Sequence, residues 1–226
     1  MPIRSHCVRS RIGTGIGAAH NNRSARFAAS PQMSVLLIAG SPTVPSRSSA
    51  LLDAAADRLQ RRGLSTRRLL VRDLPAQALL YADFGNAQLQ EATAAVASVQ
   101  AVIVATPVYK AAYSGLLKTF LDVLPPTALK GKTVLPLATG GSPHHMLALD
   151  YALRPVLNSL GARHILPGVY ASDAQVTLTP EGAYQIQVDL FDRLADAVDT
   201  LQAEAFPQQA RPGFDPVHFS AVRCSV

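Results

Sequence analysis

The sequence is poor in cysteine and has no long hydrophobic run. Two cysteines occur among 226 residues, Cys7 and Cys224, and they lie near opposite ends of the chain. This pair makes neither a disulfide framework nor the spacing of a metal site, so we expect no metal and a reducing, cytoplasmic location. No apolar run approaches the roughly 20 residues that a helix needs to span a bilayer, so we expect no membrane insertion.

Acidic residues are missing from the first 32 positions. That segment holds five arginines, whereas the whole chain has 21 basic and 15 acidic residues and a net charge of +6. Without those five arginines, 16 basic groups face 15 acidic ones, and the rest of the chain is close to neutral. The domain therefore lacks the basic surface that nucleic-acid binding requires, and we expect no such partner.

The leading segment also lacks apolar periodicity, which predicts disorder over residues 1–32. Its Arg-rich composition fits an extended or misassigned start with Met33 as the functional initiator, or an organelle transit peptide. The run GTGIGA at residues 13–18 is not a dinucleotide fingerprint, because no strand precedes it and the expected acidic residue is absent. The predicted domain covers residues 33–206, and a C-terminal tail covers residues 207–226.

Within the domain, apolar runs typical of buried strands alternate with segments of helical periodicity. Predicted strands cover residues 35–39, 69–71, 101–105 and 133–138, and a fifth begins at 164–166; predicted helices cover residues 48–62, 86–98, 115–124, 145–160 and 188–203. This alternation predicts an α/β fold with helices on both faces of a parallel sheet. Five strands favour the flavodoxin-like three-layer sandwich with strand order 2-1-3-4-5.

The loop after the first strand, GSPTVPSRSS, leads into the N-terminus of a helix. Free backbone N–H groups and the helix dipole favour an anion there. Four serines, among them Ser41, Ser48 and Ser49, and the guanidinium of Arg47 add donors suited to a phosphate monoester. A helix cap would explain one serine but not the whole group. The loop also lies beside the point between strands 1 and 3 where the order reverses, which is where such sheets bind ligands.

The loop after the third strand, TPVYKAAYSG, combines two tyrosines with a lysine. Pro107 stiffens the strand exit, Tyr109 is suited to lie along a planar ring, and Lys110 is suited to meet a phosphate or an anionic ring. The simpler interpretation is a surface loop whose tyrosines are half-buried against the next helix.

The loop after the fourth strand, ATGGSPHH, contains Gly140 and Gly141, which allow the backbone to approach a ligand closely. A plain turn is the alternative. His144 and His145 are adjacent and cannot share one helical face as metal ligands, so we expect them to be exposed. The three loops are expected to meet at one crevice. Together they offer donors for a phosphate, a surface for a planar ring and a close approach to the backbone, which predicts binding of flavin mononucleotide (FMN).

Several stretches resemble the NADPH-dependent FMN reductases, and within them the reductase components of alkanesulfonate two-component monooxygenase systems. They are AGSP…PSRSS, LLYADF, IVATPVYKAAYSGLLKT, LPLATGG and DYALRPVL, which span about residues 33–175. The resemblance implies that FMN and NADPH are the cofactors, and that reduced FMN leaves to a partner monooxygenase that frees sulfite from sulfonates. No general acid or base is expected, because hydride passes directly between nicotinamide and flavin.

By matching position, the resemblance implies a role for each of several residues. Tyr113 matches a tyrosine in a π-helical bulge at a tetramer interface near the flavin, a feature associated with flavin used as a substrate. Thr43 departs from the family, in which many members carry a basic residue after GSP, so the phosphate is expected to depend more on Arg47. The FMN phosphate is assigned to Ser41, Arg47, Ser48 and Ser49, and the flavin ring to Pro107, Val108, Tyr109, Thr139, Gly140 and Gly141.

Alternatives stay open at this point. A quinone, azo or chromate reductase that keeps its FMN would have the same fold and phosphate loop. A flavodoxin-type electron carrier is usually acidic, unlike this domain, and a plain FMN-binding protein would not consume NADPH. Preference between NADPH and NADH is open, because no separate nucleotide fingerprint exists. The resemblance implies a homotetramer or a dimer.

Overall fold

The computed structural model describes residues 34–180 and 182–207, and every structural statement below concerns those residues. Both cysteines, Met33, the segment 1–32 and nearly all of the expected tail lie outside them, so the expectations for those parts stay predictions.

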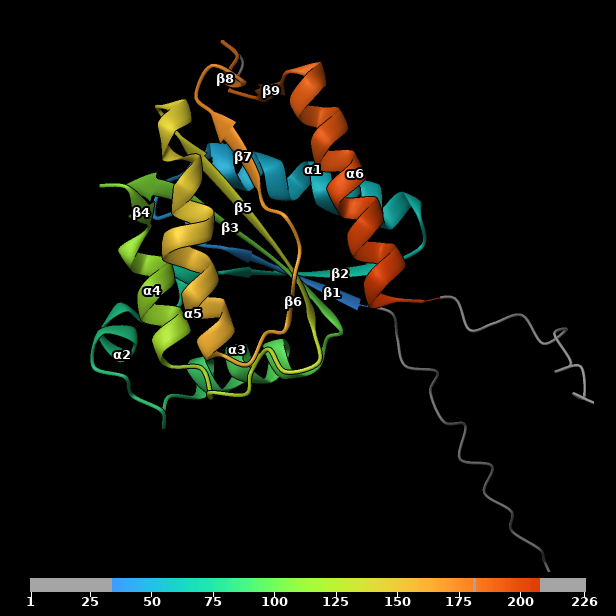
Figure 1. Ribbon diagram of the computed structural model, residues 1–226. Coiled ribbons are helices and arrows are strands. Elements are labelled where there is room, and N and C mark those ends of the chain that lie inside the picture. Colours follow the sequence, from blue (N-terminus) through green and yellow to red (C-terminus); the bar gives the residue numbers. More distant parts are fainter. Residues whose placement is uncertain (1–33, 181, 208–226) are drawn as a thin grey trace, which may run out of the picture. The chain divides into compact units, whose positions relative to one another are not determined.

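A parallel sheet forms the centre of the fold (Figure 1). Its order is β2–β1–β3–β5–β6, and β7 also pairs with β5. The predicted flavodoxin-like order 2-1-3-4-5 is confirmed, since β5 is the fourth predicted strand and β6 with β7 is the fifth. The strands are β1 (Ser34–Ala39), β2 (Ser65–Leu70), β3 (Ala101–Tyr109), β4 (Ala112–Tyr113), β5 (Thr133–Gly140), β6 (His164–Ile165), β7 (Val169–Ser172), β8 (Val176–Leu178) and β9 (Tyr184–Ile186).

Helices cover both faces of this sheet, with α1 and α6 on one face and α3, α4 and α5 on the other (Figure 1). They are α1 (Arg47–Arg61), η1 (Val71–Asp73), α2 (Ala76–Leu80), α3 (Ala87–Ala97), α4 (Gly115–Asp122), η2 (Pro143–Leu147), η3 (Leu149–Leu153), α5 (Arg154–Ser159) and α6 (Val188–Ala205).

The side chains of β1 alternate between the two layers. Leu36 and Ile38 pack into the core under α3, α4 and α5, whereas Val35 and Leu37 pack under α1 and α6. All four are at most 2% exposed. A strand buried on both faces must be apolar at every position, which explains the continuous run VLLIA.

Parallel register brings the strand exits together. Ala39 at the end of β1 pairs with Leu70 in β2 and with Ala105 in β3, and Pro107 in β3 pairs with Thr139 in β5. The loops that follow β1, β3 and β5 therefore open at one edge of the sheet.

The second strand is longer than the sequence predicted and begins at Ser65. It lies at the edge of the sheet, and its arginines point to opposite faces: Arg67 pairs with Glu91 of α3, and Arg68 pairs with Asp53 of α1. Because charged residues at an edge break the apolar run, only the end of the strand was recognisable. Val71, predicted to close the strand, instead begins the 3-10 turn η1.

The sequence predicted one continuous helix over residues 145–160, and this is wrong. The structure divides the segment into a 3-10 turn, a π-helical turn and α5. Pro155 has no N–H to donate to the carbonyl four residues earlier, and its ring would collide with that carbonyl in a regular α-helix. The π-helical turn at Leu149–Leu153 widens the backbone just before this proline.

The fifth strand is split into β6 and β7 for a related reason. Thr133 pairs with His164, whereas Leu137 pairs with Val169, so the fifth strand contains one extra residue between these pairs. Pro136 lies in β5 between the two paired segments and has no N–H for a ladder bond. A bulge opposite this proline keeps the ends of both strands in the sheet.

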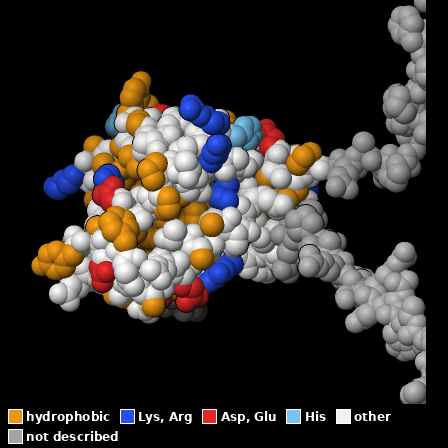
Figure 2. Space-filling model, turned by 90° about the horizontal axis from the view of Figure 1, so that it is seen from below, with side chains coloured by type: hydrophobic (Ala, Val, Ile, Leu, Met, Phe, Trp, Pro, Cys, Tyr) orange, Lys and Arg blue, Asp and Glu red, His pale blue; other side chains and the backbone are white. Residues whose placement is uncertain are grey.

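None of the helices in the described part of the chain is long and apolar enough to cross a membrane. The face around α2 and α3 is mixed: Figure 2 shows hydrophobic side chains interspersed with single charged ones. Leu80, Tyr81 and Phe84 are the large exposed hydrophobic residues of α2 and the loop that follows it.

Candidate active site

A cleft of about 240 Å³ opens at the carboxyl ends of β1, β3 and β5. This is the edge at which open parallel sheets bind ligands. The cleft brings together eight of the residues predicted from sequence: Ser41, Arg47, Pro107, Val108, Tyr109, Thr139, Gly140 and Gly141. It also contains Ser46, one of the four serines of the predicted phosphate loop, and four residues that were not predicted, namely Thr43, Pro45, Asp173 and Tyr184.

The N-terminus of α1 lies at one end of the cleft. Ser46 is the N-cap residue, but its side chain makes no capping bond, and its Oγ lies 3.0 Å from Oγ of Ser48. Ala50 donates the first intrahelical bond, to the carbonyl of Ser46. The N–H groups of the three residues before Ala50 therefore have no partner within the helix, and no acidic residue occupies the first turn. Such an uncapped terminus favours an anion.

Arg47 reaches from this helix toward β8. Its Nε donates to the carbonyl of Val176 at 2.9 Å and lies 3.7 Å from a carboxylate oxygen of Asp173. A guanidinium has five N–H donors, so this anchoring uses one and holds the group at the edge of the cleft. Asp173 comes from the turn after β7, and the sequence offered no pattern that would have singled it out.

Ser48 and Ser49 do not line this cleft, and their role as hydroxyl donors to a phosphate stays a prediction. Ser48 is 1% exposed and lies behind Ser46, and Ser49 faces a different cleft. Successive residues of a helix point about 100° apart, so adjacent serines cannot all face one ligand. Their backbone N–H groups still belong to the helix terminus. Ser41 lies in the cleft, where its Oγ is 3.3 Å from Oγ1 of Thr43.

The exit of β3 forms a second wall. The strand continues through Tyr109 and turns back into β4, so that Val108 pairs with Tyr113. Tyr109 lines the cleft and is 47% exposed, which leaves its ring free to contact a ligand.

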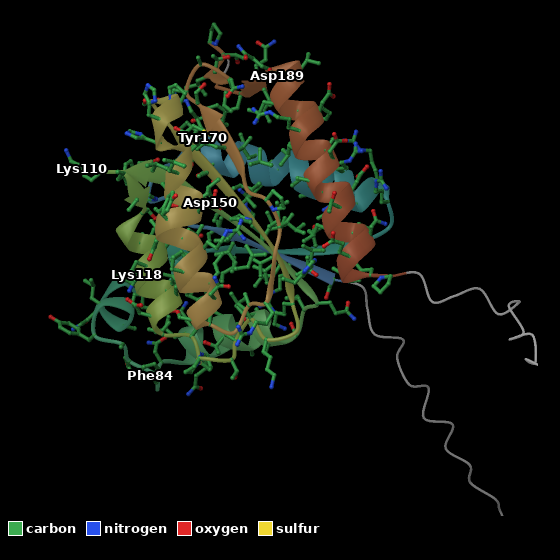
Figure 3. The ribbon with its side chains drawn as sticks, viewed as in Figure 1. Phe84, Lys110, Lys118, Asp150, Tyr170 and Asp189 are labelled. Carbon is green, nitrogen blue, oxygen red and sulfur yellow. The ribbon has the colours of Figure 1, made fainter. Side chains whose placement is uncertain are left out.

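Lys110 does not line the cleft, and its role as a contact of the flavin stays a prediction. Lys110 and Ala111 have φ values of 50° and 63° and form the two-residue turn between β3 and β4. This pair of left-handed residues is typical of a tight hairpin. The turn directs Lys110 away from the sheet into solvent (Figure 3).

Ser114 holds two of the loops together and was not predicted. Its Oγ donates to the carbonyl of Gly40 at 2.5 Å and accepts from N–H of Leu117 at 3.1 Å, while its own N–H donates to Oγ1 of Thr106 at 2.9 Å. Ser114 is 1% exposed. Its place directly before an apolar helical pattern is a capping signal that the sequence did contain.

Gly140 and Gly141 differ in how much room a side chain would have at each position. A Cβ on Gly140 would lie 2.7 Å from the hydroxyl of Tyr170 and 3.3 Å from Cβ of Val108, so a side chain fits only if these neighbours shift. A Cβ on Gly141 would have Asp173 as its nearest neighbour, at 3.7 Å. Tyr170 is buried, donates to the carbonyl of Ser142 at 2.5 Å, and has a pKa raised by burial.

Tyr113 lies in β4, so the expected π-helical setting of this residue is wrong. Its backbone is held by the pairing with β3, and α4 begins only after the Ser114 cap. The π-helical turn of the described chain is η3 instead. Burial raises the pKa of the half-buried Tyr113 hydroxyl.

Of the two adjacent histidines, only His144 is fully exposed as predicted. His145 is half-buried, and its Nδ1 is buried without a hydrogen-bond partner among the described residues.

Comparisons with known proteins agree with one another. The family model for NADPH-dependent FMN reductases matches residues 33–177. A protein named FMN reductase (NADPH) from Pseudomonas putida is 47% identical over 182 residues, covering 80% of this chain and 91% of that protein. A protein of the same name from Escherichia coli is 48% identical over 168 residues, covering 74% and 87%.

Two further similarities concern function and structure. A protein named NADH-dependent FMN reductase SfnF from Pseudomonas putida is 33% identical, covering 75% of this chain and 91% of that protein. The apo crystal structure of an NADH:FMN oxidoreductase (EMOB) is 43% identical, with a TM-score of 0.69, covering 76% of this chain and 89% of that one. A flavodoxin from Streptococcus pneumoniae, at 15% identity and a TM-score of 0.53, is similar in fold alone.

Proposed function

Because the chain belongs to the family of NADPH-dependent FMN reductases, we propose that the cleft at the ends of β1, β3 and β5 binds FMN and NADPH and supports hydride transfer between them. NADPH supplies the hydride when bound, and FMN accepts it. The protein's contribution is to bind and orient the two molecules.

The uncapped N-terminus of α1 is the observation that carries this proposal. Its free N–H groups, the hydroxyls of Ser41 and Ser46, and the guanidinium of Arg47 meet at one end of the cleft. Backbone N–H groups at a helix terminus, hydroxyls and a guanidinium are the donors that a phosphate monoester accepts. The FMN phosphate is proposed to bind here.

The opposite end of the cleft suits a planar ring. Pro107, Val108 and Tyr109 form one wall, and Thr139 with Gly140 and Gly141 forms the other. A Cβ on Gly140 would press against the hydroxyl of Tyr170, whereas neither glycine places a side chain between its own backbone and the cleft. A ring edge can therefore approach main-chain N–H groups without meeting a side chain.

The proposal extends to the fate of the product. Reduced FMN is proposed to leave the site for a partner monooxygenase that acts on sulfonates, which makes the flavin a substrate. Support comes from the resemblance of the TPVYKAAYSG stretch to reductase components of such systems. The proposed oligomer is a tetramer or a dimer, with Tyr113 near the subunit interface.

NADPH oxidation by the purified protein, with and without added FMN, tests this function. We expect a nearly colourless protein that oxidises NADPH only when FMN is supplied, with saturable dependence on FMN. A protein that is yellow when purified and reduces a quinone or dye without added FMN would instead be a reductase that keeps its flavin.

A further inference from the structure

An acidic side chain lies in the cleft that is proposed to bind FMN. Asp173 lines this cleft together with Ser41, Ser46 and Arg47, which are the proposed donors to the phosphate. A phosphate monoester carries a charge of about −1.5 to −2 at neutral pH, so a carboxylate in the same cleft repels it. Phosphate binding alone therefore does not explain why this position is acidic.

The backbone of the turn between β7 and β8 holds Asp173 at the cleft. The N–H of Asp173 donates to the carbonyl of Gly140 at 3.1 Å, which ties the turn to the end of β5. The turn itself is closed by the N–H of Gln175, which donates to the carbonyl of Ser172 at 3.0 Å. Because these bonds are made by the main chain, the carboxylate of Asp173 can be replaced without opening the turn.

The carboxylate of Asp173 is positioned between the two ends of the cleft. Its Oδ1 lies 3.7 Å from Nε of Arg47, beyond the range of about 3.2 Å for a hydrogen bond, and its Oδ2 is the atom nearest to a Cβ placed on Gly141, at 3.7 Å. No hydrogen bond to either oxygen is recorded in the described part of the chain, and the side chain is 47% exposed. The carboxylate therefore contributes little to the stability of the turn, and its main effect is a negative charge in the cleft.

Arg47 does not depend on this carboxylate for its position. Its Nε donates to the neutral carbonyl of Val176 at 2.9 Å. The two terminal nitrogens of the guanidinium carry four further N–H groups, for which no bond is recorded among residues 34–180 and 182–207. These donors remain for a phosphate, but the charge of Asp173 offsets the charge of Arg47 that would attract it.

We propose that Asp173 sets the affinity for FMN: its charge opposes that of Arg47 and keeps phosphate binding weak enough for the flavin to be released after each reaction. This inference rests on the proposed function, because it takes the FMN phosphate to bind at α1. Reduced FMN retains the phosphate, so the same repulsion acts on the product. A protein that keeps its flavin gains nothing from an acid at this position, whereas a reductase that passes reduced flavin to a partner does.

Calorimetric titration of the purified protein with FMN and riboflavin tests this role without depending on turnover. In the Asp173→Asn variant we expect the dissociation constant for FMN to fall about three- to fivefold, as for one partly exposed pair of charges. Riboflavin has no phosphate, so its dissociation constant should change little. The variant should also retain more FMN than the unmodified protein through gel filtration.

Two further variants separate the charge from other effects. Asp173→Ala offers no hydrogen-bond donor and should tighten FMN binding as well, whereas the amide of asparagine could bond directly to the phosphate. Asp189→Asn is the matched control, because it removes the same charge from the N-terminus of α6 (Figure 3), where Asp189 accepts from Nε2 of Gln175 at 3.1 Å and does not line the cleft. It should change neither flavin's affinity. Thermal unfolding of each variant establishes that it is folded.

Four outcomes overturn the proposal. Weaker or unchanged FMN binding in both variants of Asp173 would show that the charge does not oppose the phosphate. Tightening in Asp173→Asn alone would indicate a new bond from the amide, and equal tightening of FMN and riboflavin would indicate an effect on the ring. Equal tightening of FMN in Asp189→Asn would indicate an effect of net charge. Absence of FMN binding to the unmodified protein would instead remove the proposed function itself, and the unmodified protein alone reveals it.

Discussion

Arg47 is the residue whose role in the phosphate site can be tested most directly. Its side chain lines the cleft and is held there by the carbonyl of Val176. We expect Arg47→Ala to weaken FMN binding about tenfold, because a charge-assisted bond to phosphate is lost. Riboflavin has no phosphate, so its affinity should change little, and titration with both flavins measures the difference.

Arg61→Ala is a matched control for that change, because Arg61 lies on the same helix and, among the described residues, its side chain donates to the backbone carbonyl of Asp57 in its own helix. Equal losses of affinity for FMN and riboflavin in Arg47→Ala would contradict a phosphate contact and would indicate a structural role.

Gly140 offers a prediction about stability. Because a Cβ would lie 2.7 Å from the hydroxyl of Tyr170, Gly140→Ala should lower the free energy of unfolding by about 1–3 kcal/mol, as overpacking does. Gly141→Ala should cost much less, since its Cβ would meet only ordinary contacts. Urea denaturation compares the two. Removing the hydroxyl with Tyr170→Phe should recover part of the loss, and no recovery would place the clash elsewhere.

Individual side chains were the least predictable part of the site. The sequence identified the loops after β1, β3 and β5 because small residues and turn residues follow buried strands. It could not separate Ser41, which lies in the cleft, from Ser48, which is buried behind it. Side-chain direction depends on where the helix begins, and the left-handed turn at Lys110 depends on pairing with β4.

At the scale of elements, α1 and α6 are joined by a small ionic cluster. Arg58 donates two hydrogen bonds of 2.6 Å to the carboxylate of Asp199, and Arg62 donates a third at 2.5 Å. The bonds from Arg58 lower the pKa of Asp199 below its usual value. The cluster fixes two helices that cover the same face of the sheet.

This cluster predicts a pH dependence. A carboxyl group with a lowered pKa in the folded state stabilises the fold above its unfolded pKa of about 3.9 and loses that effect as pH falls through the folded value. Asp199→Asn should therefore destabilise the protein at pH 7, by about 1 kcal/mol for a partly exposed cluster. Its difference from the unmodified protein should shrink below about pH 4. Denaturation at both pH values measures this.

Asp192→Asn provides the control on the same helix, since no ion pair of Asp192 is recorded among the described residues. A difference between Asp199→Asn and the unmodified protein that stays constant from pH 7 to pH 3 would contradict the role of the charge.

Helices and strands could be predicted from the sequence where burial requires a regular pattern of apolar residues. Residues 35–39 and 101–105 are buried on both faces, and their continuous apolar runs predict strands. The edge strand β2 was recognised only at its end, because its arginines serve ion pairs instead of the core. The helix over residues 145–160 was predicted as regular because its apolar period continues through Pro155, and the π-helical turn that accommodates this proline leaves no separate signal.

At the scale of the molecule, one apolar surface suits self-association. Tyr151 in η3 is 79% exposed, and Met146 and Leu147 in η2 are each more than half exposed. β4, which carries Tyr113, packs beside η3. Contiguous exposed apolar groups of this kind mark interaction surfaces. The proposed oligomer would bury this surface and bring Tyr113 close to the subunit boundary.

Tyr151→Asp tests that arrangement, because a carboxylate at the centre of a buried interface is unpaired and costly. We expect light scattering to show a smaller assembly than that of the unmodified protein, with the thermal stability of each subunit retained. Tyr81→Asp is the control, since Tyr81 is 77% exposed on the face around α2. If Tyr81→Asp dissociates the assembly and Tyr151→Asp does not, the interface lies over α2, and Tyr113 would then be distant from it. A change in flavin retention that accompanies dissociation only in Tyr151→Asp would link the assembly to release of the flavin.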